Sequence, residues 1–297
     1  MSTASLRRTE TGYLVTELHE DPAGLVLVRR PGPAREGHHE PCPDVVASLG
    51  ALTVPGVVWA APVHRGFLLE PGVERFVVPG PASVATLVLG GMPPAAVATM
   101  LRPVGGALGA VHASPLRTRR APAAVRRLHS WLLTGRAPGE GARLHAALTD
   151  RPAFHRFAVD ATERVLSAPA CCALGAPGQS VLYPHPDGSA TTVLLTDEVG
   201  DAPPEWDLGW LLGELLELLN APARAPEPRP LAGFPPADAL LAGYDAPLDE
   251  GLLARTCLLR WLLHLHDYAA YVDWDDDLLA RLDRIAALAA DLPRVLG

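Results

Sequence analysis

The chain has 297 residues, of which 48% are hydrophobic and 20% are charged, and its formal net charge is -8. This composition is typical of a folded protein with a full core, and the length suits two lobes or domains. Nucleic acid is excluded as the main partner because its binding needs a basic surface, and the same reasoning applies to an acidic membrane surface.

Residues 1–76 are predicted to form a small β-rich lobe. Short runs rich in branched side chains, bounded by Gly, Pro and charged residues, predict strands of an antiparallel sheet. These runs lie at 13–16, 25–29 and 66–70. Apolar spacing over 44–52 predicts a helix, and Pro43 is acceptable in its first turn.

Residues 77–297 are predicted to form a larger, mainly helical lobe. Apolar stripes predict helices over 97–112, 142–167 and 252–271, and a further helix from Leu278. The acidic run 273–277 could suggest a metal cluster, but carboxylates before a helix more often cap it and meet its positive dipole end. We therefore expect this run to begin the last helix.

The central segment, residues 171–219, carries the most informative pattern. A short strand-like stretch leads to a turn at Asp187-Gly188, then to an apolar run that ends on Asp197, and Trp206-Asp207-Leu208 opens an apolar helix. This order resembles the catalytic centre of the aminoglycoside phosphotransferase and choline kinase family. The resemblance implies an α+β, protein-kinase-like two-lobe fold with a small antiparallel β-rich N-lobe, a larger helical C-lobe and a hinge near 70–77.

The resemblance also implies chemical roles, and the chain departs from several of them. Where the family has HGDxxxxN, this chain reads Leu174-Gly175-Ala176, so Ala176 occupies the position of the base and cannot accept a proton. Ser180 falls at the position of the metal-binding asparagine, with Gln179 as a substitute ligand. Asp197 is retained at the strand-end metal position. Asp207 is retained at a position that braces the catalytic loop.

The nucleotide phosphates lose their usual anchors. The chain contains no lysine, and all 25 basic residues are arginine. In place of the family's phosphate-binding lysine, the predicted strand offers only Arg29 and Arg30. The nearest carboxylates to pair with them are Asp44 or Glu40. No glycine-rich phosphate loop is visible either.

Three functions stay open at this point. The leading hypothesis is a catalytically degenerate, pseudokinase protein that binds a peptide, a small molecule or a partner enzyme, because loss of a general base alone forfeits about 10²- to 10⁴-fold in rate. An alternative is an atypical phosphotransferase acting on a hydroxyl, and ATP and magnesium are expected as cofactors only under this reading. The third is a ligand-sequestering resistance protein. Degenerate members also resemble kinase-like components that some actinobacterial peptide natural-product pathways pair with a lyase.

Two surfaces could bind that ligand. An acidic wall is expected in the cleft and would favour a cationic ligand. Its expected members are Asp197, Asp201, Asp267 and 273–277, with Gln179 and Asp207 in the same cleft. The arginines of 117–127 form the only basic cluster, and they are either a solvated helix face or a docking patch for an anionic ligand.

The four cysteines give no sign of a disulfide framework or a zinc site. Cys171 and Cys172 are adjacent, and no CxxC spacing occurs. We expect small buried hydrophobic residues in a reducing compartment. No apolar stretch reaches the ~18 residues of a membrane span, and the first twenty residues lack an apolar signal core. The sequence therefore predicts a cytoplasmic protein with no membrane partner.

Overall fold

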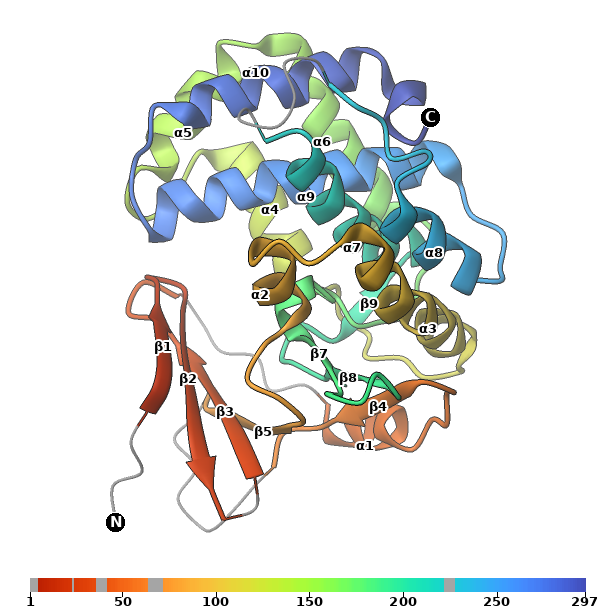
Figure 1. The fold of residues 1–297 in the computed structure, drawn as a ribbon. Coiled ribbons are helices and arrows are strands. Elements are labelled where there is room, and N and C mark those ends of the chain that lie inside the picture. The colour runs from red at the N-terminus through yellow and green to blue at the C-terminus, as the bar shows by residue number, and fades with distance from the viewer. Residues whose placement is uncertain (1–4, 23, 36–41, 64–71, 222–227) are drawn as a thin grey trace.

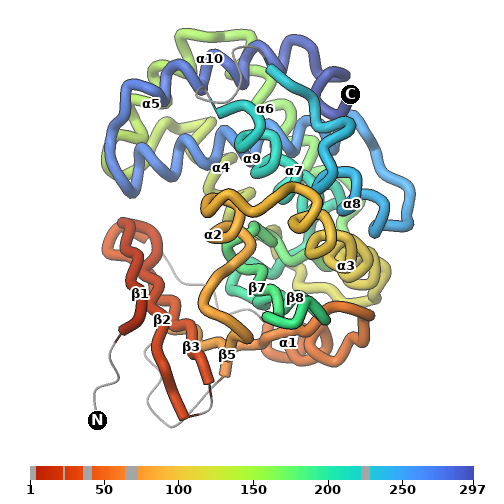
Figure 2. The backbone as a smooth tube through the Cα atoms, in the orientation of Figure 1, coloured from red at the N-terminus to blue at the C-terminus, as the bar shows by residue number. Residues whose placement is uncertain are grey.

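The computed structural model describes residues 5–22, 24–35, 42–63, 72–221 and 228–297. A small antiparallel sheet lies to one side of a mainly helical body, and the red-to-orange start of the chain forms that sheet (Figure 1). The tube view shows that the chain then passes through the body and ends among its helices (Figure 2). The predicted α+β fold class is confirmed.

The N-lobe sheet has four antiparallel strands in the order β1-β2-β3-β5. Their bounds are β1 Ser5–Glu10, β2 Leu14–Asp21, β3 Gly24–Pro31 and β5 Glu74–Val78. The strand predicted at 25–29 is therefore confirmed within β3. Leu18, Leu27 and Phe76 face inward and pack with Tyr183 and Leu194 of the helical lobe, so an apolar cluster joins the two lobes.

The hinge predicted near 70–77 is wrong in its second half. Residues 74–78 form β5, which pairs with β3 and buries Phe76 and Val78 on alternate positions. The passage to the helical lobe therefore follows Val78, and the expected lobe boundary at residue 76 falls inside a strand. The strand predicted at 66–70 lies outside the described residues.

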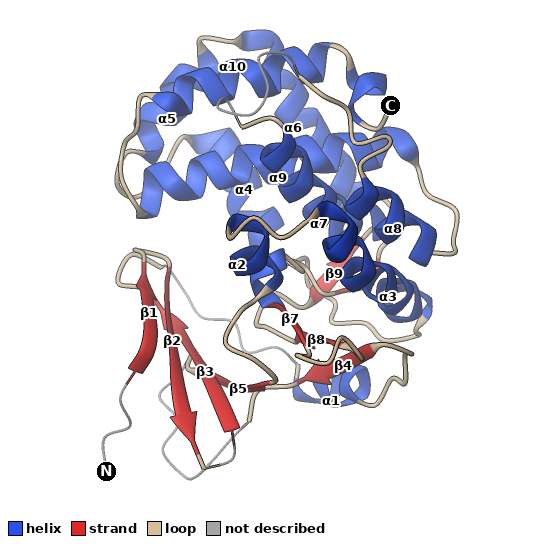
Figure 3. Cartoon of the chain, viewed as in Figure 1, coloured by secondary structure: helices blue, strands red, loops and turns tan. Residues whose placement is uncertain are grey.

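The helix predicted at 44–52 is confirmed as α1 Pro43–Gly50, but it packs away from the N-lobe sheet. Its buried Val45, Val46 and Leu49 belong to the core of the helical lobe. The next strand, β4 Val57–Ala60, pairs in parallel with β8 Thr191–Leu194 of the helical lobe. Figure 3 shows α1 beside β4 and β8, apart from β1 and β2.

The helical lobe contains most of the remaining elements. They are α2 Val84–Leu89, α3 Pro94–Ala113, α4 Ala123–Thr134, α5 Gly141–Thr149, α6 Pro152–Ser167, β6 Cys171–Ala173, β7 Leu182–Pro184, β8 Thr191–Leu194, β9 Gly200–Ala202, α7 Pro204–Leu219, α8 Pro235–Gly243, α9 Glu250–Tyr271 and α10 Asp277–Ala290, with 3₁₀ turns at Gln179–Val181 and Leu292–Val295. The helices predicted at 97–112, 142–167 and 252–271 are confirmed as α3, α5 with α6, and α9.

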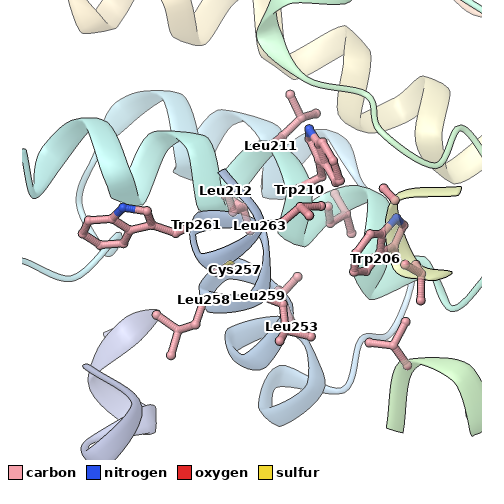
Figure 4. Packing of buried hydrophobic residues seen from close by; sticks show 14 of the residues in the cluster. Trp206, Trp210, Leu211, Leu212, Leu253, Cys257, Leu258, Leu259, Trp261 and Leu263 are labelled. Atoms are coloured by element: carbon pink, nitrogen blue, oxygen red, sulfur yellow. The ribbon is translucent and has the colours of Figure 1, made fainter. Parts of the chain in front are cut away.

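The centre of the core lies where α7 packs against α9. Apolar side chains from both helices interdigitate there, including Trp206, Leu212, Cys257 and Trp261 (Figure 4). The close approach depends on a glycine, because a Cβ on Gly209 would lie 2.5 Å from the Cβ of Thr256. A larger residue would force the helices apart.

The acidic run 273–277 leads into α10 as predicted, although Asp276 at the N-cap position makes no side-chain capping hydrogen bond. The Asp275 carboxylate accepts the backbone N–H of Asp277 at 2.9 Å, and that of Asp276 accepts the indole N–H of Trp274, also at 2.9 Å. Within the described ranges, no group of three or more His, Cys, Asp or Glu could hold a metal ion. Of the helices in the described parts of the chain, none combines the length and apolarity needed to cross a membrane.

Candidate functional site

The central segment folds into two small strand pairs ahead of α7. β6 pairs with β9, and β7 forms an antiparallel hairpin with β8. The hairpin turn contains Gly188 at φ 72°, and the Asp187 carboxylate accepts the Ser189 N–H at 3.0 Å. The hairpin predicted around Asp187-Gly188 is confirmed, and it delivers Asp197 three residues beyond the end of β8.

Asp207 braces the loop that precedes the hairpin. Its carboxylate is fully buried and accepts the backbone N–H groups of Leu174 at 2.7 Å and Gly175 at 2.8 Å. His112 at the end of α3 lies 3.1 Å from the same carboxylate, and its other ring nitrogen meets the Tyr244 hydroxyl. Asp207 is thus committed to backbone support and faces no cleft, so its expected place in the ligand cleft is wrong.

The loop itself keeps its shape without a catalytic side chain. Gly175 adopts φ 84°, a conformation that favours glycine, and its carbonyl accepts the Trp206 indole N–H at 2.5 Å. Ala176 follows it at the position where the resemblance expects a base. Its methyl group packs against the core and offers no atom that could take a proton.

Asp197 is bound by an arginine from the other lobe. The Arg35 guanidinium forms an ion pair with its carboxylate, and the two side chains are 5% and 3% exposed. Arg35 also lies over the ring of Tyr13, 4.5 Å from the ring centroid. The residue expected to hold a metal ion therefore joins the lobes through a buried charge pair.

Tyr13 is the centre of a second set of interlobe contacts. It lies in the turn between β1 and β2, and its hydroxyl accepts from Arg127 of α4 at 2.7 Å and donates to Glu198 at 3.1 Å. Burial and the Glu198 carboxylate raise the pKa of Tyr13 well above its ordinary value, so the phenol stays protonated. The other Glu198 oxygen accepts the N–H of Ala124 at 2.9 Å.

Asp267 of α9 completes this network. Its carboxylate pairs with Arg127 at 3.0 Å and lies 2.8 Å from Nδ1 of His266. Burial alone would raise the pKa of Asp267, but Arg127 and His266 outweigh it and hold that pKa well below its usual range. A backbone hydrogen bond also links the two lobes here, because the Gly12 N–H donates to the Tyr271 carbonyl at 2.7 Å.

The two arginines proposed for phosphates are both held by carboxylates. Arg29 lies on the same face of the sheet as the buried Leu27 and pairs with Glu74 at 3.0 Å. Arg30 lies on the opposite face and pairs with Glu17 at 2.5 Å. Burial raises the pKa of Glu74 well above its ordinary value, against the opposing effect of Arg29. The expectation that Asp44 pairs with one of these arginines is wrong, because α1 packs on the helical lobe and leaves Asp44 exposed. Glu40 lies outside the described residues.

Three other expected site residues do not meet Asp197 in the cleft. Gln179 and Ser180 line a separate cavity of about 460 Å³ that also includes Glu214 and Arg260. The Asp201 carboxylate holds the loop before α4, accepting the N–H groups of Thr118 at 2.8 Å and Arg119 at 2.7 Å. The assignment of Asp201 to a ligand wall is wrong, because backbone donors occupy both of its oxygens.

The expected acidic wall is replaced by an arginine-rich cavity. A cavity of about 700 Å³ lies against Tyr13, Arg35, α4 and the end of α9. Asp197 and Asp267 are paired with Arg35 and Arg127, so neither presents a free negative charge to the cavity. Sequence reasoning missed Arg35 and Tyr13. Their only signal was the basic or aromatic character of residues beside turns, which is too common to single them out.

A magnesium nucleotide does not fit the residues that the fold would assign to it. Arg29 and Asp197 are both in buried ion pairs within the chain, and Ala176 supplies no base. The turn between β1 and β2 presents Tyr13 and is hydrogen-bonded to α9. A magnesium ion also prefers at least one carboxylate oxygen from the protein. Here the carboxylate at the metal position, that of Asp197, is ion-paired with the Arg35 guanidinium.

Solved structures of known proteins share the fold of this chain. No protein-family model and no curated protein sequence matches the chain. Choline kinase LicA from Streptococcus pneumoniae has a TM-score of 0.57 at 13% identity, with 96% of this chain and 95% of that one covered. A choline/ethanolamine kinase family protein from Mesorhizobium loti has a TM-score of 0.54 at 17% identity, with 96% and 87% covered.

A third solved structure shows the same likeness. Aminoglycoside phosphotransferase APH(3'')-Id from Streptomyces rimosus has a TM-score of 0.50 at 12% identity, with 84% of this chain and 90% of that one covered. These likenesses span both lobes and agree with the resemblance of the central segment. The chain therefore has the protein-kinase-like fold that choline and ethanolamine kinases share with aminoglycoside phosphotransferases.

Proposed function

We propose that the protein is a catalytically degenerate member of the kinase fold, which binds a ligand or partner without transferring a phosphoryl group. One observation carries the proposal: the carboxylate at the metal position, Asp197, is buried in an ion pair with Arg35 from the opposite lobe. A magnesium ion would have to displace that guanidinium. Breaking a buried charge pair costs about 3–5 kcal/mol, so the metal starts at a large disadvantage.

The other positions point in the same direction. Phosphoryl transfer depends on positioning and on charges that stabilise the transferring group, with little covalent chemistry by the protein. In this chain the phosphate-anchoring position is Arg29, paired with Glu74, and the base position is Ala176. A phosphotransferase built on Arg29 or Arg30 would have to free each of them from a carboxylate first.

The region between the lobes instead has a cavity that could hold a ligand or a segment of a partner. Contacts from Tyr13, Arg35 and Arg127 fix the two lobes against each other beside a cavity of about 700 Å³. The candidates for its occupant are a peptide, a small molecule or a segment of a partner enzyme, and the family resemblance suggests a peptide natural-product pathway as the setting. The cavity is within the ~300–1,000 Å³ range of small-molecule sites.

Thermal unfolding with ATP tests the proposal. A ligand present at 100 times its dissociation constant raises the free energy of unfolding by about 2.7 kcal/mol. We expect ATP with magnesium to stabilise the protein no more than ATP with a chelator does. Stabilisation that requires magnesium, and that disappears in Asp197→Asn, would contradict the proposal and restore a phosphotransferase.

A further inference from the structure

The cavity beside Tyr13 has a distinctive charge. Four guanidinium groups line it, and no Asp or Glu of the described residues does so. These arginines are Arg35, Arg126, Arg127 and Arg136. Two of them are neutralised by ion pairs with carboxylates that do not line the cavity, Arg35 by Asp197 and Arg127 by Asp267. The charge of the lining therefore depends on the other two.

Arg126 and Arg136 have no charge partner within the described part of the chain. Both side chains are exposed, and no carboxylate of a described residue lies within 4.0 Å of either. The chain has a formal net charge of -8, yet no Asp or Glu of the described residues lines this cavity. Two uncompensated guanidinium groups at the edge of a concave site attract anions and raise their local concentration.

Aromatic rings also line the cavity. The Trp131 ring is 1% exposed and packs 4.8 Å from His266, while the Tyr13 ring lies 5.1 Å from Tyr271. All four rings line the cavity. A cavity lined by both arginines and aromatic rings suits a ligand that has an anionic group and a flat apolar part.

The segment that carries Arg136 is held in place by the backbone. Gly135 ends α4 at φ 67°, where a side chain would be strained. The chain then returns along α9, and the Glu140 N–H donates to the Ala269 carbonyl at 2.9 Å. Arg126 is fixed differently, by its place on α4 beside Arg127. The two cations thus come from a helix and from an anchored turn.

We propose that this cavity binds a small organic anion, a carboxylate or phosphate monoester with an aromatic or planar body, through Arg126 and Arg136. Guanidinium groups bind both kinds of oxyanion through paired N–H donors, so the same geometry serves either source. The inference rests on the proposed function, because it names the ligand class of a non-catalytic cleft. It also replaces the cationic ligand that the expected acidic wall had suggested.

Calorimetric titration with phenyl phosphate and phenylacetate tests the proposal. We expect at least one of them to bind with a dissociation constant below about 1 mM. The double variant Arg126→Gln/Arg136→Gln should weaken that binding at least about tenfold, since it removes the charge-assisted hydrogen bonds. Arg156→Gln on α6 is the matched control, an exposed arginine outside the cavity lining, and it should leave the affinity unchanged.

Salt gives a second readout that a folding defect would not reproduce. Rising ionic strength should weaken binding to the wild-type protein and have less effect on the residual binding of the double variant. Preference for phenyl phosphate would assign the anion as a phosphate, and preference for phenylacetate would assign a carboxylate. Absence of binding by both, or equal affinity in wild type and double variant, would overturn the inference.

These outcomes are separable from failure of the proposed function. If neither anion binds and ATP still shows no magnesium-dependent effect, only the anion site is lost. ATP bound without magnesium and weakened by the double variant would support the anion site. Magnesium-dependent ATP binding that needs Asp197 would overturn the proposed function, whatever the two anions do.

Discussion

Asp197 and Asp207 come from the same central segment and are both buried, yet their partners differ in kind. Asp207 accepts the backbone N–H groups of Leu174 and Gly175 and contacts His112, and all of these residues belong to the helical lobe. Asp197 pairs with Arg35, which comes from the N-terminal part of the chain. The first aspartate supports a fold, and the second joins two lobes.

The difference teaches that two buried carboxylates of one segment can be held in different ways. Backbone N–H groups are present whatever the side chains are, so a carboxylate that satisfies them supports the fold independently of any catalytic role. A metal-binding carboxylate without its metal is a buried charge that needs a new partner. In this protein Arg35 supplies that partner, and the ion pair joins the two lobes.

Removal of Asp207 should have the largest effect on stability. Asp207→Ala leaves the N–H groups of Leu174 and Gly175 buried without acceptors, and each such group costs about 1–3 kcal/mol. We expect the free energy of unfolding, measured by urea denaturation, to fall by about 3–5 kcal/mol.

The control for this variant is Asp273→Ala, at an exposed position before α10, which should change stability by no more than about 0.5 kcal/mol. Equal losses in the two variants would mean that Asp207 does not brace the loop, and the contrast between the two regions would disappear.

A double-mutant cycle measures the charge pair between the lobes. Arg35→Ala, Asp197→Ala and the double variant should give a coupling energy of about 1–3 kcal/mol, because both side chains are nearly fully buried. The matched control is Arg151 with Asp283, whose carboxylate is 63% exposed. That pair should couple by less than about 1 kcal/mol. A coupling no larger than the control would show that Asp197 is not committed to Arg35.

Acid should weaken the Arg127 contact in a defined pH window. The folded state holds the pKa of Asp267 below its usual range, so the pair stabilises the protein fully above the unfolded-state pKa of about 3.9 and loses this contribution as the pH falls further. The wild type should exceed Asp267→Asn in stability by about 1 kcal/mol at neutral pH. This difference should shrink below about pH 4, and a difference that grows there would contradict the ion pair.

Much of the fold could be predicted from the sequence because the signals were local. Three local signals each specify an element through neighbouring residues: the run of branched side chains at 25–29, the turn at Asp187-Gly188 and the apolar spacing of 252–271. The position of α1 could not be predicted in this way. Its apolar face was recognisable, but which lobe that face covers depends on residues far along the chain.

The site was harder to predict for the same reason. Ala176 and Asp197 could be placed by their spacing within one segment, whereas Arg35 and Tyr13 reach the site from other elements across the cleft. Asp201 and Asp44 were misassigned because a carboxylate in a sequence does not reveal its donors. Asp201 is committed to the backbone of 118–119, and Asp44 projects from a helix that packs elsewhere.

Binding of manganese in the presence of ADP tests most directly whether Asp197 still serves a metal. Mn²⁺ favours the same oxygen ligands as magnesium, and electron paramagnetic resonance reports how much of it is bound to the protein. If Arg35 holds the metal position, the wild-type protein should leave the Mn²⁺–ADP signal unchanged up to about 1 mM. A dissociation constant below about 10 μM that is lost in Asp197→Asn would contradict the account.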